Sequence, residues 1–289
     1  MPRRIDHLVI AVQDLEKCAE FYRRLGFQVG ARNRHAWGTE NRLVQFPGTF
    51  LELITVGEGA HIPSQKPGQF SFGAFVQDYL KHREGLAMLV LDSRDAKADA
   101  AEFARKGIGS FEPFHFERTG RKPDGSETKV AFTLAFATLP SAARAGFFVC
   151  QQHYPENFWN PAFQVHENGA TGLVTVALAA PEPDSCKQFL TDFTDSIPTS
   201  PALHDLSFRL ADAHLDVMTP DDAAESYVSV EAELDQPSFV AFCVRVPDIH
   251  DQAKRLDATE IPYQHVGSRL VVPASAAHGV AIAFEPTQN

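Results

Sequence analysis

Two polar side chains inside apolar runs are the best candidates for chemistry in this chain. His7 lies in the run IDHLVIAV, and Glu52 lies in the run FLELI. A carboxylate in so apolar a strand needs a partner, because burying an unpaired charge is costly. A divalent metal ion shared with His7 would be such a partner, since imidazole nitrogen and carboxylate oxygen are ordinary ligands. The residues alone also allow a hydrogen-bonded core histidine and an exposed glutamate, without any metal ion.

The elements that position these two residues follow from the period of the apolar residues. The first 55 residues predict a strand, an amphipathic helix and three further strands. If Leu8 and Ile10 pack on the helix, alternation turns His7 to the concave side of the sheet, on the same face as Ile5. Glu52, which lies between two leucines, points away from both of them.

The same order of elements recurs four times along the chain. Each strand-like run is followed by a helix-like stretch and by shorter β-like runs; the four runs are LVIAV (8–12), LAMLVLD (86–92), LVTVALAA (173–180) and FVAFCVRV (239–246). The repeat predicts an α+β fold of four βαβββ modules in two pairs, with antiparallel hairpins and one crossover helix in each module. We expect an N-terminal domain at 1–160, with an insertion at 57–85, and a degenerate C-terminal pair at 161–289.

Composition limits the classes of partner. Hydrophobic residues make up 44% and charged residues 22%, which is typical of a soluble globular protein. A formal net charge of −11 argues against nucleic acid and anionic membranes, because phosphate surfaces select for Lys and Arg. The four cysteines form no CxxC pair, and the N-terminal apolar run is interrupted by charges. We therefore expect reduced thiols, no signal peptide or membrane span, and a cytoplasmic location.

Longer stretches carry a resemblance to a known superfamily. IDHLVIAVQDLEKCAEFYRRLGF together with FLELI resembles the opening unit of the vicinal oxygen chelate superfamily, which includes glyoxalase I, extradiol dioxygenases and fosfomycin and bleomycin resistance proteins. HAWGTENRLVQF, the RKPDG hairpin and FFVCQQHYPENFWNPAFQVHENGA are similar to its glyoxalase-like domain subfamily. This closer similarity covers about residues 4–180, and the last hundred residues resemble a further, degenerate pair of the same units. The resemblance implies that the paired modules form cupped mixed sheets.

The resemblance implies metal ligands at defined positions. The superfamily usually takes one ligand from the first strand and one from the last strand of a unit, and His7 and Glu52 occupy these positions. Alignment of LAMLVLDSRD with IDHLVIAVQD on their shared aspartate puts Met88 opposite His7, and Met is a poor ligand for a hard ion. The closing strand FFVCQQH offers no carboxylate near 149–151, so His153 or one of the two preceding glutamines would have to contribute. The implied cofactor is a divalent ion (Zn, Ni, Mn or Fe) in an incomplete four-ligand site.

Further residues are candidates for catalysis or for substrate binding. His35 precedes a tight Gly38 turn and could act with Glu52 in catalysis, or it could be a surface loop histidine. The predicted substrate-binding residues are polar or aromatic and lie close to the expected cup: Asn41, Arg118, Arg121, Trp159 and His166. Asn41 could instead cap its turn, and Trp159 could simply anchor the connector that follows the second unit.

Two functions follow from these expectations. The first is a metal-assisted lyase or isomerase that acts on a small α-keto compound or a thiol adduct, with the ion polarising a carbonyl while a carboxylate or histidine moves a proton. The second is a non-catalytic protein, as in resistance proteins, that binds a small molecule in the cup. Dioxygenase activity is disfavoured, because the C-terminal pair does not supply two His and a carboxylate. We expect a small-molecule ligand, and the four units are compatible with a homodimer.

Overall fold

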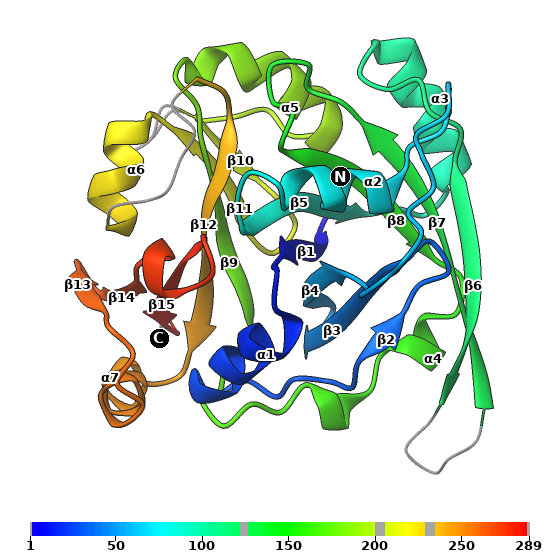
Figure 1. The fold of residues 1–289 in the computed structure, drawn as a ribbon. Coiled ribbons are helices and arrows are strands. Elements are labelled where there is room, and N and C mark those ends of the chain that lie inside the picture. Colours follow the sequence, from blue (N-terminus) through cyan, green and yellow to red (C-terminus); the bar gives the residue numbers. More distant parts are fainter. Residues whose placement is uncertain (1, 122–126, 200–205, 229–234, 288–289) are drawn as a thin grey trace.

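The chain folds into two mixed β-sheets with helices packed around them (Figure 1). The computed structural model describes residues 2–121, 127–199, 206–228 and 235–287. The predicted turn at Pro123, Asp124 and Gly125 therefore lies outside the described residues.

The first sheet has eight strands in the order β2-β3-β4-β1-β5-β8-β7-β6. Its strands are β1 (Ile5–Ala11), β2 (Asn33–Arg34), β3 (Thr39–Phe46), β4 (Thr49–Val56), β5 (Gly85–Asp92), β6 (Phe114–Arg121), β7 (Glu127–Ala137) and β8 (Gly146–Gln152). The second sheet has seven strands in the order β10-β11-β9-β12-β15-β14-β13. Its strands are β9 (Gly172–Ala179), β10 (Leu206–Arg209), β11 (His214–Met218), β12 (Ser238–Val246), β13 (Gln264–Val266), β14 (Arg269–Val272) and β15 (Ala281–Pro286).

Short helices connect and cover the strands. The α-helices are α1 (Leu15–Arg24), α2 (Phe72–Tyr79), α3 (Ala96–Lys106), α4 (Pro155–Phe158), α5 (Lys187–Thr194), α6 (Pro220–Tyr227) and α7 (Ile249–Ala258). Three 3₁₀ turns are η1 (Pro161–Phe163), η2 (Pro183–Cys186) and η3 (Ala274–Ala276). No helix within the described residues has the length and apolar character needed to cross a bilayer.

The predicted α+β fold of paired modules is confirmed. The first, second and fourth units each have the order β-α-β-β-β, whereas the third shows two strands after its helix within the described residues. In every unit the first strand runs parallel to the last strand, and paired units meet through antiparallel first strands, β1 with β5 and β9 with β12. The two sheets divide the chain between residues 152 and 172, and we keep the division at 160 as a proposal.

Aspartate caps repeat at the start of three unit helices. Asp14 before α1, Asp95 before α3 and Asp248 before α7 each accept hydrogen bonds from two backbone N–H groups of the first turn. A cap of this kind stabilises a helix by about 1 kcal/mol. The first two caps are the aspartates on which the first two units align in the sequence, so the alignment has a structural basis.

The two faces of β1 contact different parts of the molecule: one faces the apolar layer between the two sheets, and the other faces the concave side of the first sheet, the first cup. Leu8 and Ile10 pack with α1 in the apolar layer between the sheets, whereas Val9 belongs to the cluster inside the first cup. The expectation that Ile5 shares the face of His7 is wrong. The pairing of β1 with β5 shifts register between these two residues, and Ile5 packs in the layer between the sheets.

That layer joins the two sheets into one hydrophobic core. Phe147 of β8 contacts Phe189 and Phe193 of α5 and Phe239 of β12. Residues from all four units belong to this one cluster. The insertion at 57–85 also contributes to packing, because α2 places Phe72 in the cluster inside the first cup.

Candidate functional site

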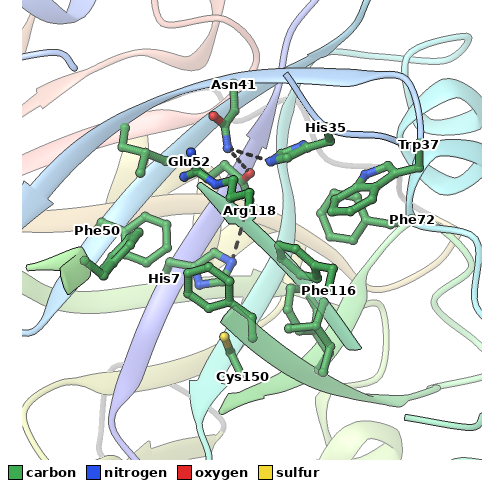
Figure 2. A pocket seen from close by; sticks show the side chains of 15 residues that line it. His7, His35, Trp37, Asn41, Phe50, Glu52, Phe72, Phe116, Arg118 and Cys150 are labelled. Carbon is green, nitrogen blue, oxygen red and sulfur yellow. Dashed lines mark hydrogen bonds and ion pairs between the residues drawn. The ribbon is translucent and has the colours of Figure 1, made fainter. Parts of the chain in front are cut away.

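The first cup holds a pocket with mostly aromatic walls and one polar side (Figure 2). Its empty volume, including the open mouth, is about 530 Å³. Seven of the fifteen lining residues carry aromatic rings other than histidine; the lining residues are His7, His35, Trp37, Asn41, Leu43, Phe50, Glu52, Phe72, Phe116, Arg118, Phe132, Leu134, Phe148, Cys150 and Phe158. The predicted residues His7, His35, Asn41, Glu52 and Arg118 are therefore brought together in one pocket.

His7 lies between two buried carboxylates. Its Nδ1 is 2.6 Å from Oδ1 of Asp6, and its Nε2 is 3.7 Å from Oε2 of Glu52. Exposed fractions of 4% for Asp6, 5% for His7 and 6% for Glu52 place all three out of bulk water. Because a carboxylate only accepts hydrogen bonds, Nδ1 carries the ring proton and donates a hydrogen bond to Asp6, and Nε2 is the ring nitrogen that faces Glu52.

Asp6 is a site residue that sequence reasoning missed. Strict alternation would turn it away from the face of His7, but the register shift in β1 lets it reach the same imidazole. Gln152 at the end of β8 donates from Nε2 to the other oxygen of Asp6 at 2.7 Å. The only available signal was a charged residue within an apolar strand.

Phe50 fixes the plane of the His7 ring. The two rings stack with their centroids 4.4 Å apart and an angle of 13° between their planes, and Phe148 contacts the same imidazole edge-on. A ring held on one face and by a hydrogen bond at Nδ1 loses little further freedom when a ligand binds.

Asn41 fixes the second carboxylate. Its Nδ2 donates to Oε1 of Glu52 at 2.5 Å and lies 3.3 Å from Nε2 of His35. His35 Nδ1 is 2.8 Å from Oγ1 of Thr39, so both ring nitrogens are in use. Burial lowers the pKa of His35, and the charge of Glu52 opposes that shift, so the pocket favours the neutral ring. These contacts leave Oε2 of Glu52 as the oxygen that faces His7.

Arg118 brings a positive charge to the same pocket from β6. Its Nη1 donates to Oδ1 of Asn33 at 3.1 Å, and the Nδ2 of Asn33 donates to Oδ1 of Asn41. Burial lowers the pKa of Arg118, and the charge of Glu52 opposes that shift. The guanidinium therefore lies within electrostatic range of Glu52, and among the residues that the structure describes its hydrogen-bond partner is Asn33.

The donors present do not fit a complete four-ligand metal site. Val9 pairs with Glu52 across β1 and β4, and Val90, the matching residue of the second unit, pairs with Phe148 across β5 and β8. Phe148 thus occupies the position that Glu52 holds in the first unit, just as Met88 matches His7. Neither is a ligand for a hard divalent ion. Among the residues that the structure describes, no group of three or more His, Cys, Asp or Glu side chains could hold a metal ion.

His153, which was expected as a further metal ligand, does not line the pocket. It is an exposed residue that follows β8, and its Nε2 is 2.7 Å from Oγ1 of Thr133. Its ring contacts His115, whose Nδ1 bonds the same hydroxyl. The lining residue at this end of β8 is instead Cys150, a buried thiol that sequence reasoning did not select.

His166 and Trp159 belong to the connector after the second unit. His166 accepts a hydrogen bond at Nδ1 from the backbone N–H of Gln28 and donates from Nε2 to the carbonyl of Gln45. With both nitrogens used, it holds the connector to the sheet outside the pocket. Trp159 contacts Phe50 and lines an adjoining groove that shares Arg118 with the pocket. The side chain of Arg121 lies outside the described residues.

Comparisons with known proteins agree with this fold. Residues 5–194 match a family model described as a glyoxalase-like domain. Among curated proteins no match was found. A hypothetical protein from Staphylococcus aureus is similar over 98% of this chain and 99% of its own, with a TM-score of 0.69 and 13% identity.

Two further solved structures have the same fold at low identity. A mutant 4-hydroxymandelate synthase from Streptomyces coelicolor has a TM-score of 0.62 and 13% identity, covering 98% of this chain and 92% of its own. A Mn(II)-bound glyoxalase from Novosphingobium aromaticivorans has a TM-score of 0.57 and 11% identity, covering 98% of this chain and 82% of its own. These likenesses concern the arrangement of the paired modules.

Proposed function

Since the chain belongs to the glyoxalase-like domain family, we propose that it is a lyase or isomerase that moves a proton on a small oxygenated metabolite. The substrate is an α-keto compound or a thiol adduct of one. The observation that carries this proposal is the pair of His7 and Glu52, 3.7 Å apart and buried in a pocket with aromatic walls. Two ionisable groups held together away from water are typical of proton-transfer sites.

Glu52 is the base in the proposed reaction. Its Oε2 takes a proton from the carbon next to a carbonyl, and the C–H electron pair moves onto the carbonyl oxygen to give an enolate. The proton then returns to the neighbouring carbon or oxygen, so that no oxidant or reductant is needed. Asn41 holds the other oxygen of Glu52, and His7 lies within reach of the carboxyl group to relay the proton.

Other residues of the pocket orient the substrate. Arg118 lies on its polar side and can donate hydrogen bonds to substrate oxygens, and Trp159 borders the adjoining groove. Asn41 lines the same side, but its two amide hydrogens are directed to Glu52 and His35, so it orients Glu52 and not the substrate. His35 acts through Asn41 in this proposal, because both of its ring nitrogens are already used. The metal ion named for one structural neighbour has no complete donor set here, so no step is assigned to a metal.

The test is deuterium exchange at carbon, followed by NMR. The purified chain in D₂O is offered a panel of α-keto and α-hydroxy carbonyl compounds, each alone and as the adduct of a small thiol. We expect at least one compound to exchange its C–H catalytically and Glu52→Gln to slow that exchange by about a hundredfold or more. Glu20→Gln, on the exposed face of α1, is the matched control. Equal rates in Glu52→Gln and the unaltered chain would refute the role of Glu52.

A specific observation favours a second function, binding without turnover. Met88 and Phe148 are apolar where two further ligands are expected, and the rings of one tryptophan and six phenylalanines line the pocket. A protein that sequesters an aromatic small molecule needs only such a cup. Tight binding of a panel compound without exchange at any carbon would support this alternative over the enzyme.

A further inference from the structure

Among the described residues that line the pocket, Arg118 is the one with a positively charged side chain. It comes from β6 of the second unit, on the same strand face as Phe116, and its side chain is partly buried. Within the described residues, no carboxylate lies within ion-pair distance of its guanidinium, and Asn33 is the partner that holds it. A partly buried guanidinium without an ion pair is suited to binding an anion that the protein itself does not supply.

The proposed proton transfer needs a positive charge in the pocket. Removing a proton next to a carbonyl builds negative charge on oxygen, and Asp6 and Glu52 already place two carboxylates nearby. In a complete four-ligand site a metal ion would balance that charge, but Met88 and Phe148 occupy two of the ligand positions here. Arg118 lies close enough to Glu52 for their charges to interact.

We propose that the guanidinium of Arg118 takes the electrostatic place of a metal ion in this pocket and thereby selects an aromatic or branched apolar α-keto acid as substrate. The carboxylate or the developing enolate oxygen pairs with the guanidinium, and the apolar body lies among the rings around Phe50, Phe116 and Phe132. This inference rests on the proposed function, because it assigns the substrate of the same site.

The closing experiment measures binding rather than turnover. Isothermal titration compares phenylacetate with phenylacetamide, two probes of similar shape that differ in charge. In the unaltered chain we expect phenylacetate to bind more tightly. Arg118→Met should weaken phenylacetate by about ten- to a hundredfold and leave phenylacetamide unchanged, because charge-assisted hydrogen bonds contribute that much. Arg118→Lys should recover part of the loss, and Arg105→Met, on the exposed face of α3, should change nothing.

A second arm repeats the titrations with Mn²⁺ and with a chelator. We expect neither to change the affinity for phenylacetate. The inference is overturned if Arg118→Met binds phenylacetate normally, if neither probe binds, or if Mn²⁺ binds through His7 and Glu52 and strengthens phenylacetate binding. Circular dichroism of each variant controls for folding.

The outcomes separate this inference from the proposed function. Exchange that depends on Glu52 but also on Mn²⁺, and not on Arg118, would leave the proposed function standing and remove the inference. Binding that depends on Arg118, without any exchange in D₂O, would leave the anion site standing and remove the proposed proton transfer.

Discussion

Asp6 accepts a 2.6 Å hydrogen bond from Nδ1 of the neighbouring His7, although consecutive residues of a strand normally face opposite sides of the sheet. The register shift in β1 makes this contact available, and Gln152 holds Asp6 in place from β8. Carboxylate–imidazole pairs fix the tautomer and the orientation of a working histidine. Asp6 is therefore a positioning residue for His7.

Replacement of Asp6 by Asn should lower kcat of the exchange reaction about tenfold or more with little change in KM, because the ring of His7 loses its fixed tautomer. If Asp6 only stabilised the fold, its replacement would leave the pH dependence of kcat unchanged. If Asp6 positions His7, its replacement should shift that pH dependence. Measurement of kcat and KM between pH 5 and pH 9 tests both points. Asp78→Asn, on the exposed face of α2, is the control. An unchanged kcat and pH profile would remove the positioning role.

The two apolar ligand positions predict a gain of metal binding. The double variant Met88→His, Phe148→Glu adds an imidazole and a carboxylate at the positions that match His7 and Glu52. In the presence of a chelator we expect the double variant to be less stable than the unaltered chain, because Phe148 is buried. In Zn²⁺ the variant should regain stability by RT ln(1 + [L]/Kd), where L is the free metal ion. The readout is Tm with and without Zn²⁺.

The unaltered chain and each single variant are the controls for that measurement. If Zn²⁺ stabilises the unaltered chain as much as the double variant, Met88 and Phe148 do not mark missing ligand positions.

His166 should make the chain sensitive to acid. Burial lowers its pKa from 6.5, against the opposing hydrogen bond to the carbonyl of Gln45. The folded state therefore binds the proton more weakly than the unfolded state does. The stability contribution is complete above pH 6.5 and is lost as the pH falls through the folded pKa. Urea unfolding at pH 8, 7, 6 and 5 should show a decline in the free energy of unfolding below pH 7.

The variant His166→Gln should flatten that decline, because glutamine can accept from Gln28 and donate to Gln45 without titrating. His82→Gln, at an exposed position, should retain the full decline. The same slope in His166→Gln and the unaltered chain would contradict this assignment.

Cys150 should resist thiol reagents although it lines the pocket. It is 4% exposed, and burial, followed by the charges of Asp6 and Glu52, raises its pKa well above the ordinary value. The thiol is therefore neutral and unreactive at neutral pH. All four cysteines are buried, so we expect no fast reaction with an aromatic disulfide reagent in the native state and four reactive thiols in urea. A fast single thiol that disappears in Cys150→Ala would contradict this prediction.

Phe147 should make the two sheets unfold together. Its ring packs against Phe189, Phe193 and Phe239 and is 1% exposed, so Phe147→Ala should cost about 3–5 kcal/mol. Because the contact spans both pairs of units, urea unfolding followed by near-UV and far-UV circular dichroism should remain a single transition. Phe163→Ala, at an exposed position, is the control. Two separated transitions in the unaltered chain would mean that the sheets unfold independently.

The sequence by itself determined the repeating fold and indicated that His7 and Glu52 face the same side of the first sheet. Alternation of Leu8 and Ile10 with His7 predicted which face of β1 meets the helix, and the shared aspartates Asp14 and Asp95 gave the alignment that puts Met88 opposite His7. These features could be predicted because strand alternation and helix capping act within a few residues of one another.

Only the tertiary structure decided which residues complete the pocket. Asp6 can bond His7 because the pairing of β1 with β5 shifts register by one residue. Arg118 lies on a strand of the second unit, far from His7 in the sequence. Phe148, and not a residue at 149–151, occupies the position that matches Glu52. His153 lies outside the pocket. A shift of a single residue in a strand changes the face that every later side chain presents, and the pairing between distant strands fixes that shift. No local pattern in the sequence predicts where such a shift in strand register occurs.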